Sequence, residues 1–376
     1  AKTIVRTWLE SVHLKKAVSL GLPEIDDRYH IWRVPLLAQH TNERVGEAVI
    51  DAVTSLIDDC KTTQPPVIEA RLLHRTVNDD GKQRGSVPKY QPSALRNTLI
   101  LGDSEFALQE MPASSVDLVF TSPPYFNARP EYTDYITYDE YLLKLRKIFH
   151  CAHRVLNEGR FIVINVSPVL IRRASRNESS RRIPVPFDIH RVLTDEGFDF
   201  MEDIIWVKPE GAGWATNRGR RFAADRNPLQ YKPAPVTENI LVYRKHTDRL
   251  IDWNIRTHPN QELVKGSRIE DPYEKTNVWY LKPAHDRRHP AIFPDELVER
   301  VIRYYSFKGD VVLDPFAGIG TVGRVATRLE RRFVLIENNP DYVESIRSEL
   351  PAWLGFGAAD VLTLNCKPAD VSSVLL

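Results

Sequence analysis

The 376-residue chain holds 51 basic and 50 acidic residues, a net charge of +1, so a polyanion must be bound by a local basic patch rather than by bulk charge. Charged residues at 27% and hydrophobic residues at 42% are typical of a soluble globular protein with two or three structural units. The three scattered cysteines lack the spacing of metal ligands. The longest apolar run (161–171) is too short to cross a bilayer, and the N-terminus has no signal-peptide pattern. We therefore expect a cytoplasmic protein without disulfides or membrane contact.

Residues 1–92 differ in pattern from the rest of the chain. Apolar residues recur at helical spacing over 8–20 and 45–57, and the breakers Pro65-Pro66 and a polar run at 78–92 follow. We predict a small helical domain and a linker, without a motif that assigns a role.

From residue 98 onward, apolar segments of strand type alternate with helical patterns. Strands are expected at 98–101, 116–120, 161–166, 200–207, 238–243, 311–313 and 333–336, and helices at 106–111, 138–156, 187–196, 294–305, 322–329 and 340–350. Asn157-Glu158-Gly159 is expected to end the helix that starts at Tyr138. This alternation predicts a doubly wound, mostly parallel α/β sheet.

The strand at 116–120 leads into a turn formed by Ser122-Pro123-Pro124-Tyr125. Two prolines fix two successive φ angles and remove two backbone donors, so nearby carbonyl groups stay available to a ligand. A rigid turn with a hydroxyl and an aromatic ring suits the binding of a flat base that carries an exocyclic amine. By itself, the segment fits a purely structural Pro-Pro turn beside a core tyrosine equally well.

A second motif, Asp314-Pro-Phe-Ala-Gly318-Ile-Gly320-Thr321, lies between the strand at 311–313 and a helix. Its glycines let the backbone approach a ligand, and the helix N-terminus offers free N–H groups. The next strand ends at Glu337, where an acidic residue binds a ribose diol in nucleotide-binding α/β folds. The third glycine of the dinucleotide spacing is missing, so the motif favours a smaller adenosyl ligand over NAD.

Together these motifs resemble those of the DNA amino-methyltransferases that use S-adenosylmethionine. Thr121 to Tyr125 resembles their catalytic motif and Asp314 to Thr321 their cofactor turn, in the order found in the circularly permuted, β-type members. Further segments resemble the same family in the same order: 101–104, 238–245, 289–294 and 337–340. The resemblance covers residues 97–350 and leaves the first 92 residues outside.

The resemblance implies a Rossmann-like, permuted methyltransferase fold with S-adenosylmethionine as cofactor and no required metal. The implied cofactor-binding residues are Asp103, Ser104, Thr121, Phe293, Asp314, Phe316, Gly318, Gly320, Thr321, Glu337 and Asn338. The implied catalytic residues are Ser122, Pro123, Pro124 and Tyr125. Ser122 and the Pro123 carbonyl would accept hydrogen bonds from the target amine, Tyr125 would stack on the flipped base, and Pro124 would keep the turn rigid.

The serine at the first position of the catalytic motif favours the N4 of cytosine as the target, because serine there is commoner in that group of the family. The N6 of adenine stays the alternative. Cys60, Cys151 and Cys366 lack the Pro-Cys context of the enzymes that methylate carbon 5 of cytosine. We therefore expect direct in-line transfer to nitrogen, without a covalent enzyme intermediate.

Arginine-rich segments at 170–184 and 209–235 are candidates for DNA contact, since basic side chains neutralise phosphates and read guanine edges. The candidate DNA-binding residues are Arg172, Arg173, Arg181, Arg182, Arg218, Arg220 and Arg221. The layout that follows is a catalytic half at 93–246 with these two loops, a target-recognition region at 247–285, a cofactor-binding half at 286–356 and a C-terminal tail at 357–376. Double-stranded DNA is the expected partner, with a cognate restriction endonuclease acting on the same site, and the protein is expected to be a monomer or a homodimer.

Three other classes of protein remain open from the sequence. A methyltransferase-like DNA-binding protein without activity is disfavoured by the intact motifs, and an NAD enzyme by the glycine spacing. An RNA or protein methyltransferase is the third, because Pro-Pro-Tyr turns also suit planar amides and RNA bases.

Overall fold

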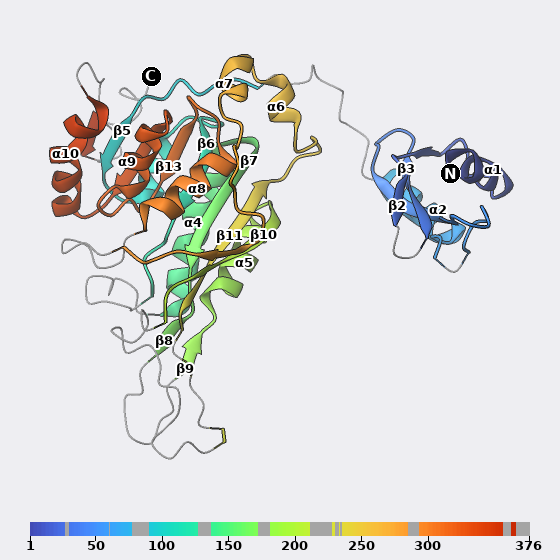
Figure 1. Cartoon of the computed structure of the whole chain (residues 1–376), viewed down its shortest axis with the longest axis horizontal. Helices are drawn as coiled ribbons and strands as arrows, with labels where there is room; N and C mark the ends of the chain where they lie inside the picture. Colours follow the sequence, from blue (N-terminus) through green and yellow to red (C-terminus); the bar gives the residue numbers. More distant parts are fainter. Residues whose placement is uncertain are drawn as a thin grey trace. The chain divides into compact units, whose positions relative to one another are not determined.

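The computed structural model describes residues 1–26, 30–59, 61–76, 90–126, 137–171, 181–210, 228–229, 233, 235–284, 293–355 and 362–365. The chain divides into two compact units, Ala1–Pro88 and Lys89–Leu376 (Figure 1). Within the described ranges, no helix has both the length and the apolar composition needed to cross a membrane.

The first unit is an antiparallel sheet with two helices. Its elements are α1 (Lys2–Ser11), β1 (Val18–Leu20), β2 (Glu24–Asp26), β3 (Ile31–Ala38), β4 (Arg44–Asp51) and α2 (Pro65–Thr76). β3 is central, since β1, β2 and β4 all pair with it. Val5 and Leu9 of α1 and Ile68 of α2 are buried in one core with side chains of the sheet.

The prediction that this unit is helical is wrong for most of its length. The apolar residues of 45–57 belong to β4 and the turn after it, and only the start of 8–20 is helical. β4 is buried at Val45, Ala48, Val49 and Ile50, so it lacks the strict alternation that marks a strand with one exposed face. Its antiparallel pairing with the preceding strand β3, which the spacing of apolar residues does not reveal, decides the strand.

Nine described strands of the second unit form one sheet in the order β12-β10-β11-β7-β6-β13-β14-β5-β15. They are β5 (Thr98–Leu101), β6 (Val116–Thr121), β7 (Leu156–Val166), β10 (Phe198–Val207), β11 (Thr237–Lys245), β12 (Val278–Tyr280), β13 (Val311–Asp314), β14 (Arg332–Glu337) and β15 (Leu362–Asn365). β11 is antiparallel to β10 and to β7, and the other neighbouring pairs are parallel. The prediction of a doubly wound, mostly parallel sheet is confirmed.

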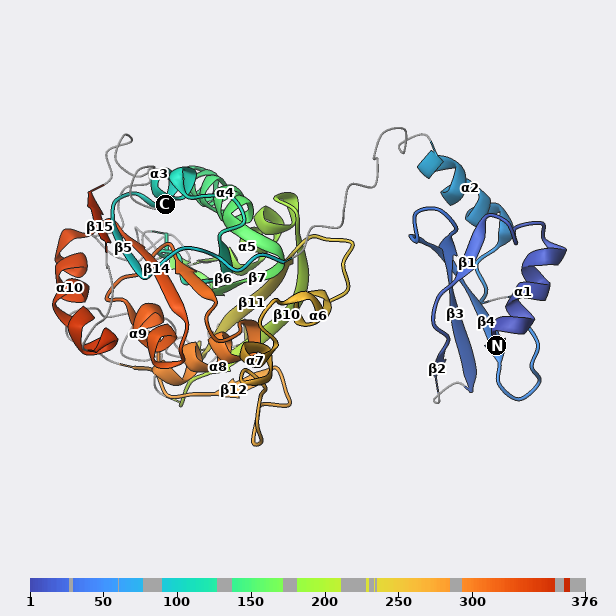
Figure 2. The ribbon, with the colours of Figure 1, turned by 90° about the horizontal axis from the view of Figure 1, so that it is seen from above.

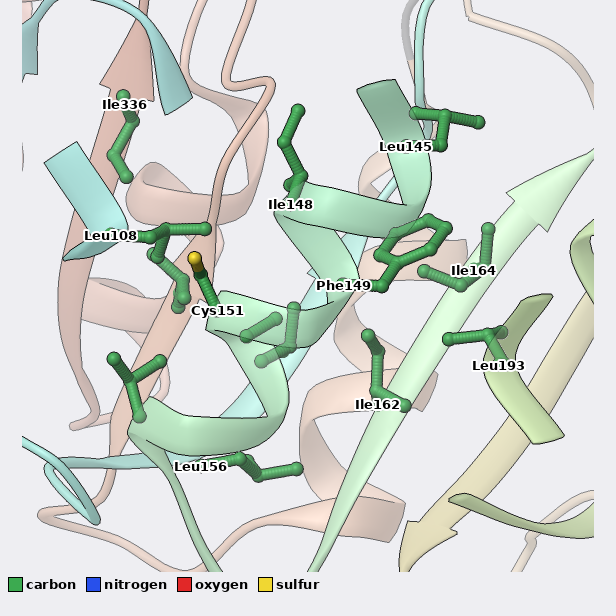
Figure 3. Close-up of a cluster of buried hydrophobic side chains, with 14 of the residues drawn as sticks. Leu108, Leu145, Ile148, Phe149, Cys151, Leu156, Ile162, Ile164, Leu193 and Ile336 are labelled. Atoms are coloured by element: carbon green, nitrogen blue, oxygen red, sulfur yellow. The ribbon is translucent and has the colours of Figure 1, made fainter. Parts of the chain in front are cut away.

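Helices cover both faces of this sheet (Figure 2). α3 (Ser104–Glu110), α4 (Tyr138–Val155) and α5 (Val185–Asp195) lie on one face, and α8 (Asp295–Tyr305), α9 (Thr321–Arg328) and α10 (Pro340–Leu354) on the other. Figure 3 shows the first of these layers, where Ile148 and Phe149 of α4 pack with Ile162 and Ile164 of β7. Cys151 is a free, buried cysteine of this apolar layer.

Some elements differ from the sequence-based expectation. α4 ends at Val155, within one residue of the expected end, but Asn157-Glu158-Gly159 belongs to the strand β7, which begins at Leu156. The buried Asn157 amide of this strand donates to Asp117 (2.8 Å). The segment 247–285 contains α6 (Trp253–Thr257), α7 (Gln261–Lys265) and the edge strand β12. The expected C-terminal tail contains β15, which pairs with β5 and so belongs to the sheet. A short hairpin of β8 (Val169–Ile171) and β9 (Arg181–Ile183) follows β7.

A buried group of charges ties the amino ends of β6, β7 and β13 together. Arg160 of β7 is 3% exposed and donates to Asp310 (3.0 Å) and to the hydroxyl of Tyr90 (2.8 Å). Asp117 of β6 accepts from the Tyr90 hydroxyl (2.9 Å) and from the backbone N–H of Val311 (2.9 Å). Burial raises the pKa of Asp310 to about 7 even though the Arg160 charge opposes the rise. Buried carboxylates of this kind depend on the guanidinium that is hydrogen-bonded to them.

We predict that Arg160→Met lowers the free energy of unfolding by about 3–5 kcal/mol at pH 8, because it leaves buried carboxylates without their cation. The loss should be smaller at pH 5. Removing Arg160 raises the pKa of Asp310 further, and a carboxyl whose folded pKa is raised destabilises the fold increasingly as pH rises.

Urea unfolding at the two pH values measures both effects. The matched control is Arg146→Met, since Arg146 pairs with Asp195 and Glu196 on the surface and its loss should cost less than about 1 kcal/mol. Equal losses for the two variants would contradict the role given to Arg160.

Candidate active site

The two sequence motifs meet at one edge of the sheet. β6, β13, β14 and β5 are parallel neighbours, so their carboxyl ends share an edge. The predicted catalytic turn begins after Thr121, Asp314 ends β13 and Glu337 ends β14. The pair Asp103-Ser104 follows β5 at the same edge. Ligands of open α/β sheets bind at such an edge.

A hydrogen bond joins the predicted catalytic turn (Ser122–Tyr125) to the predicted cofactor turn (Asp314–Thr321) through the residue before one and the first residue of the other. Thr121 Oγ1 donates to Asp314 Oδ1 at 2.6 Å, and both residues are buried. The same oxygen accepts from the backbone N–H of Phe316 (3.1 Å). Burial raises the pKa of Asp314 to about 7, while these two hydrogen bonds oppose the rise and the nearby Glu337 adds to it. The carboxyl group therefore titrates near neutral pH.

Glu337 connects β14 to the glycine turn. Its Oε2 accepts from the backbone N–H of Gly318 (2.7 Å) and its Oε1 from that of Asn339 (2.9 Å). Burial raises the pKa of this carboxyl group above its usual value. Each carboxylate oxygen has two lone pairs, so both can accept a further hydrogen bond from a ligand hydroxyl.

Glycine is required within the turn at Gly320, the residue that directly precedes α9. Its φ of +80° is left-handed, and a Cβ there would lie 2.8 Å from Trp353 Cη2. Gly318 also has a positive φ of +54°. Thr321 follows as the first, buried residue of α9. The backbone N–H groups at this helix N-terminus suit a ligand with negative or hydroxyl oxygens.

Other predicted cofactor residues border the same edge. Ser104 Oγ donates to the Pro315 carbonyl (2.5 Å), which links β5 to the turn. Asp103 caps α3 through the Glu105 N–H (2.8 Å) and also binds Lys144 Nζ (2.9 Å). Phe293 stacks on Phe120 of β6 with ring centroids 4.9 Å apart. Phe316 is half-buried against the α4 side of the core, and Asn338 is exposed.

The catalytic turn lies beside a polar group that the sequence prediction did not include. Pro123 is buried, whereas Ser122, Pro124 and Tyr125 are half-buried. The Tyr125 hydroxyl donates to Glu238 Oε2 (3.3 Å), which also accepts from Asn165 Nδ2 (2.7 Å). Lys208 forms an ion pair with the other oxygen of Glu238.

The sequence contained a signal for each of these missed residues. Asn165 is a polar residue inside an apolar strand, Glu238 is an acid at the start of another, and Lys208 follows the buried Trp206 just before an irregular segment. Their proximity depends on the pairing of β7 with β11 and of β11 with β10, which the sequence does not specify.

The structure places only part of the predicted DNA-binding set. Arg181 and Arg182 are exposed on β9, and Arg182 donates to the Pro233 carbonyl (3.0 Å). Arg172, Arg173, Arg218, Arg220 and Arg221 lie outside the described residues.

Comparison with known proteins identifies the family of this chain. The N6_N4_Mtase family, described as DNA methylase, matches residues 116–348, a range that contains both turns and more than half of the chain. The chain belongs to this DNA methylase family. The match begins with β6 and leaves the first unit outside.

Individual relatives of this DNA methylase match it over a similar share of the chain. The chain is 28% identical over 285 residues to the Type II methyltransferase M.BglII of Bacillus subtilis (72% of this chain, 74% of the relative). It is 30% identical over 288 residues to the Type II methyltransferase M.ScaI of Streptomyces caespitosus (73% and 86%). Among solved structures it is similar to TTHA0409 of Thermus thermophilus, assigned as a DNA modification methylase and crystallised with S-adenosyl-L-methionine. That similarity has a TM-score of 0.57 at 29% identity and covers 72% of this chain and 98% of the other.

We predict that Gly320→Ala lowers the free energy of unfolding by about 2–4 kcal/mol, for two reasons. The left-handed backbone is unfavourable for alanine, and the added methyl group also overlaps Trp353 and Ile346. Gly197→Ala is the matched control. Gly197 has a φ of +89°, but its added Cβ would come no closer than 3.3 Å to His153, so only the backbone cost of about 1–2 kcal/mol is expected. Urea unfolding of both variants separates the two contributions, and a Gly320 variant no worse than the control would contradict the packing argument.

Proposed function

We propose that this DNA methylase is a site-specific DNA methyltransferase that modifies the exocyclic amine of a flipped base in double-stranded DNA, as part of a Type II restriction-modification system. The observation that carries the proposal is the Thr121–Asp314 hydrogen bond, which holds the base-binding turn beside the cofactor turn. A methyl group can pass directly between two ligands only when both are held in contact. The order of the motifs, with the catalytic turn first, supports placing the chain among the permuted members of the family.

The cofactor is S-adenosylmethionine, which supplies a methyl group activated by its sulfonium charge, and the residues at the edge fit it. Glu337 has lone pairs for the ribose hydroxyls, and the N-terminus of α9 presents backbone N–H groups. The ionised Asp314 carboxyl offsets positive charge in a buried position. Phe293 and the Asp103-Ser104 pair border the place where the adenine ring would lie.

The catalytic turn prepares the nucleophile. The lone pair of an aromatic amine is delocalised into the ring, so the amine reacts poorly until its hydrogens are bound and its nitrogen is positioned. Ser122 Oγ and the Pro123 carbonyl accept from the amine, and Tyr125 stacks on the base. Pro124 limits the movement of the turn.

Nitrogen is favoured over carbon 5 of cytosine as the acceptor of the methyl group. Methylation of carbon requires a reactive thiolate, whereas Cys151 lies in the apolar layer beneath α4, where burial raises the pKa of its thiol. Cys60 and Cys366 lie outside the described residues.

The N4 of cytosine is the proposed target because Ser122 occupies the first position of the motif. A serine accepts from the amine without adding a negative charge beside the cofactor turn, where Asp314 and Glu337 already lie. The N6 of adenine is the competing target. Arg181 and Arg182 on β9 are proposed to contact phosphates, together with the arginines of the two basic segments.

We predict that DNA from cells expressing the protein carries N4-methylcytosine within one sequence context, read by sequencing with modified-base detection. Ser122→Ala should lower the methylation rate of purified protein by about 10- to 100-fold, since one acceptor for the amine is lost. If N6-methyladenine is the sole product, cytosine is wrong as the target base but the protein is still a DNA methyltransferase. Cofactor binding without methyl transfer to DNA would contradict the assignment as an enzyme and would favour a non-catalytic DNA-binding protein. Methyl transfer to RNA or protein alone would contradict the assignment of DNA as the substrate.

We also predict that S-adenosylmethionine binds more weakly as pH falls from 8 to 6, because a cationic ligand prefers the ionised form of Asp314, whose pKa is raised to about 7. Isothermal titration calorimetry across this range measures the effect. Asp314→Asn should weaken binding at pH 8 and remove most of the pH dependence. Thr121→Val removes a hydrogen bond to the carboxylate and should move the midpoint to higher pH. A midpoint unchanged in both variants would show that another group titrates.

A further inference from the structure

The group formed by Asn165, Lys208, Glu238 and Tyr125, here named the Glu238 cluster, lies beside the catalytic turn and, apart from the stacking role of Tyr125, has no part in the mechanism described above. In the register of β6 and β7, Ile164 lies opposite Thr121. Asn165 is therefore next to the point where the chain leaves β6 as Ser122. Neighbouring strands are about 4.8 Å apart, so the two residues are within reach of one small ligand group.

Alternation along the strands places these side chains on a common face. Val163 of β7 and Phe120 of β6 belong to the core layer of α8 and α9, whereas Ile162 and Ile164 belong to the layer of α4 and α5. Asn165 therefore shares a face with Val163, and Ser122, two residues beyond Phe120, continues the face of Phe120. Glu238 shares that face through Ile240 and Val242 of β11.

The hydrogen bonds of Glu238 determine which way the Asn165 amide points. Glu238 is 7% exposed and accepts from Asn165 Nδ2 (2.7 Å), from the Tyr125 hydroxyl (3.3 Å) and from Lys208 Nζ. The Lys208 ammonium also lies 4.4 Å from the centre of the Trp206 ring, which holds it in place. A carboxylate accepts only, so the NH₂ group of Asn165 must face it, and the carbonyl oxygen must face away.

That carbonyl oxygen is a buried acceptor in need of a donor. Asn165 is 3% exposed, and its Oδ1 has no hydrogen-bond partner within the described part of the chain. Leaving such a group unpaired costs about 1–3 kcal/mol, and most buried polar groups are satisfied. An orphaned acceptor at a binding edge indicates an N–H or O–H group supplied by a ligand.

We infer that Asn165 Oδ1 accepts one hydrogen of the target amine, so that Ser122 Oγ and the Pro123 carbonyl share the other hydrogen. This inference rests on the proposed function and deepens it. An exocyclic amine has two hydrogens, and holding both fixes the rotation of the NH₂ group and the direction of its nitrogen lone pair. Asn165 is thus a substrate-contacting residue, and Glu238 with Lys208 is the positioning pair that sets the amide orientation.

The test combines a protein change with a base change. Asn165→Ala is compared with wild type on duplexes that carry either the normal target base or its counterpart without the amine, 2-pyrimidinone for cytosine and purine for adenine. Asn239→Ala is the matched control: Asn239 lies on the adjacent strand, its amide also donates to a carboxylate, Asp203 (3.0 Å), and its side chain is on the opposite face. The measurements are kcat, KM for DNA and Kd for both duplexes, with S-adenosylmethionine binding as the check of folding.

For Asn165→Ala we expect kcat to fall about tenfold or more, which corresponds to one hydrogen bond. The ratio of Kd values for the amine-free and normal duplexes should fall by a similar factor, while S-adenosylmethionine binding stays unchanged. Asn239→Ala should keep both wild-type kcat and the wild-type ratio. If Asn165→Ala does not bind the cofactor, Asn165→Thr replaces it in the test. The single hydroxyl of threonine cannot bond to Glu238 and to the amine with the full strength of the amide. The same fall in the ratio of Kd values is therefore expected.

An Asn165 variant that binds the cofactor and keeps the wild-type ratio of Kd values overturns the inference, whatever its kcat, since a structural role alone does not sense the amine. A wild-type protein that transfers no methyl group to DNA overturns the proposed function before any variant is read. The two failures are therefore distinguishable.

Discussion

The pairing of β6 with β13 is the constraint on which the site depends, and the Thr121–Asp314 hydrogen bond is its end point. A buried carboxyl group is costly unless it is hydrogen-bonded, so each strand end stabilises the other. If the two strands slipped by one residue, Thr121 would turn to the other face of the sheet and the bond would be lost. Two turns that are far apart in the chain are held in contact by this register.

The two ends of the central strands have different tasks. At the amino end, Arg160, Asp117 and Asp310 form a buried set of charges that joins β6, β7 and β13, in which only the Nε of Arg160 has no partner within the described residues. At the carboxyl end, Asp314 and Glu337 keep lone pairs for a ligand, and Asn165 keeps an unpaired oxygen within the described part of the chain. Polar groups that bond to one another secure the register at the amino edge, and oxygens with free lone pairs lie at the carboxyl edge.

Sequence reasoning singled out the Ser122–Tyr125 and Asp314–Thr321 turns because each is a local pattern. A Pro-Pro turn after an apolar strand, a glycine turn before a helix and an acid at a strand end are all visible within a few residues. It missed Asn165, Lys208 and Glu238, which are separate polar residues on or beside three strands. Only the antiparallel insertion of β11 between β7 and β10 brings them together.

The N-terminal unit illustrates a second limit, the ambiguous periodicity of a buried strand. Apolar residues in β4 have helix-like spacing because the strand is buried on both faces, and its pairing partner β3 decided the outcome.

The sequence by itself determined the alternating α/β pattern and the two turns, because backbone geometry and glycine or proline requirements act over short distances. The tertiary structure decided the strand order, the titration of Asp314 near neutral pH and the Glu238 cluster. These properties depend on burial and on neighbours from distant parts of the chain, which exist only once the sheet has formed.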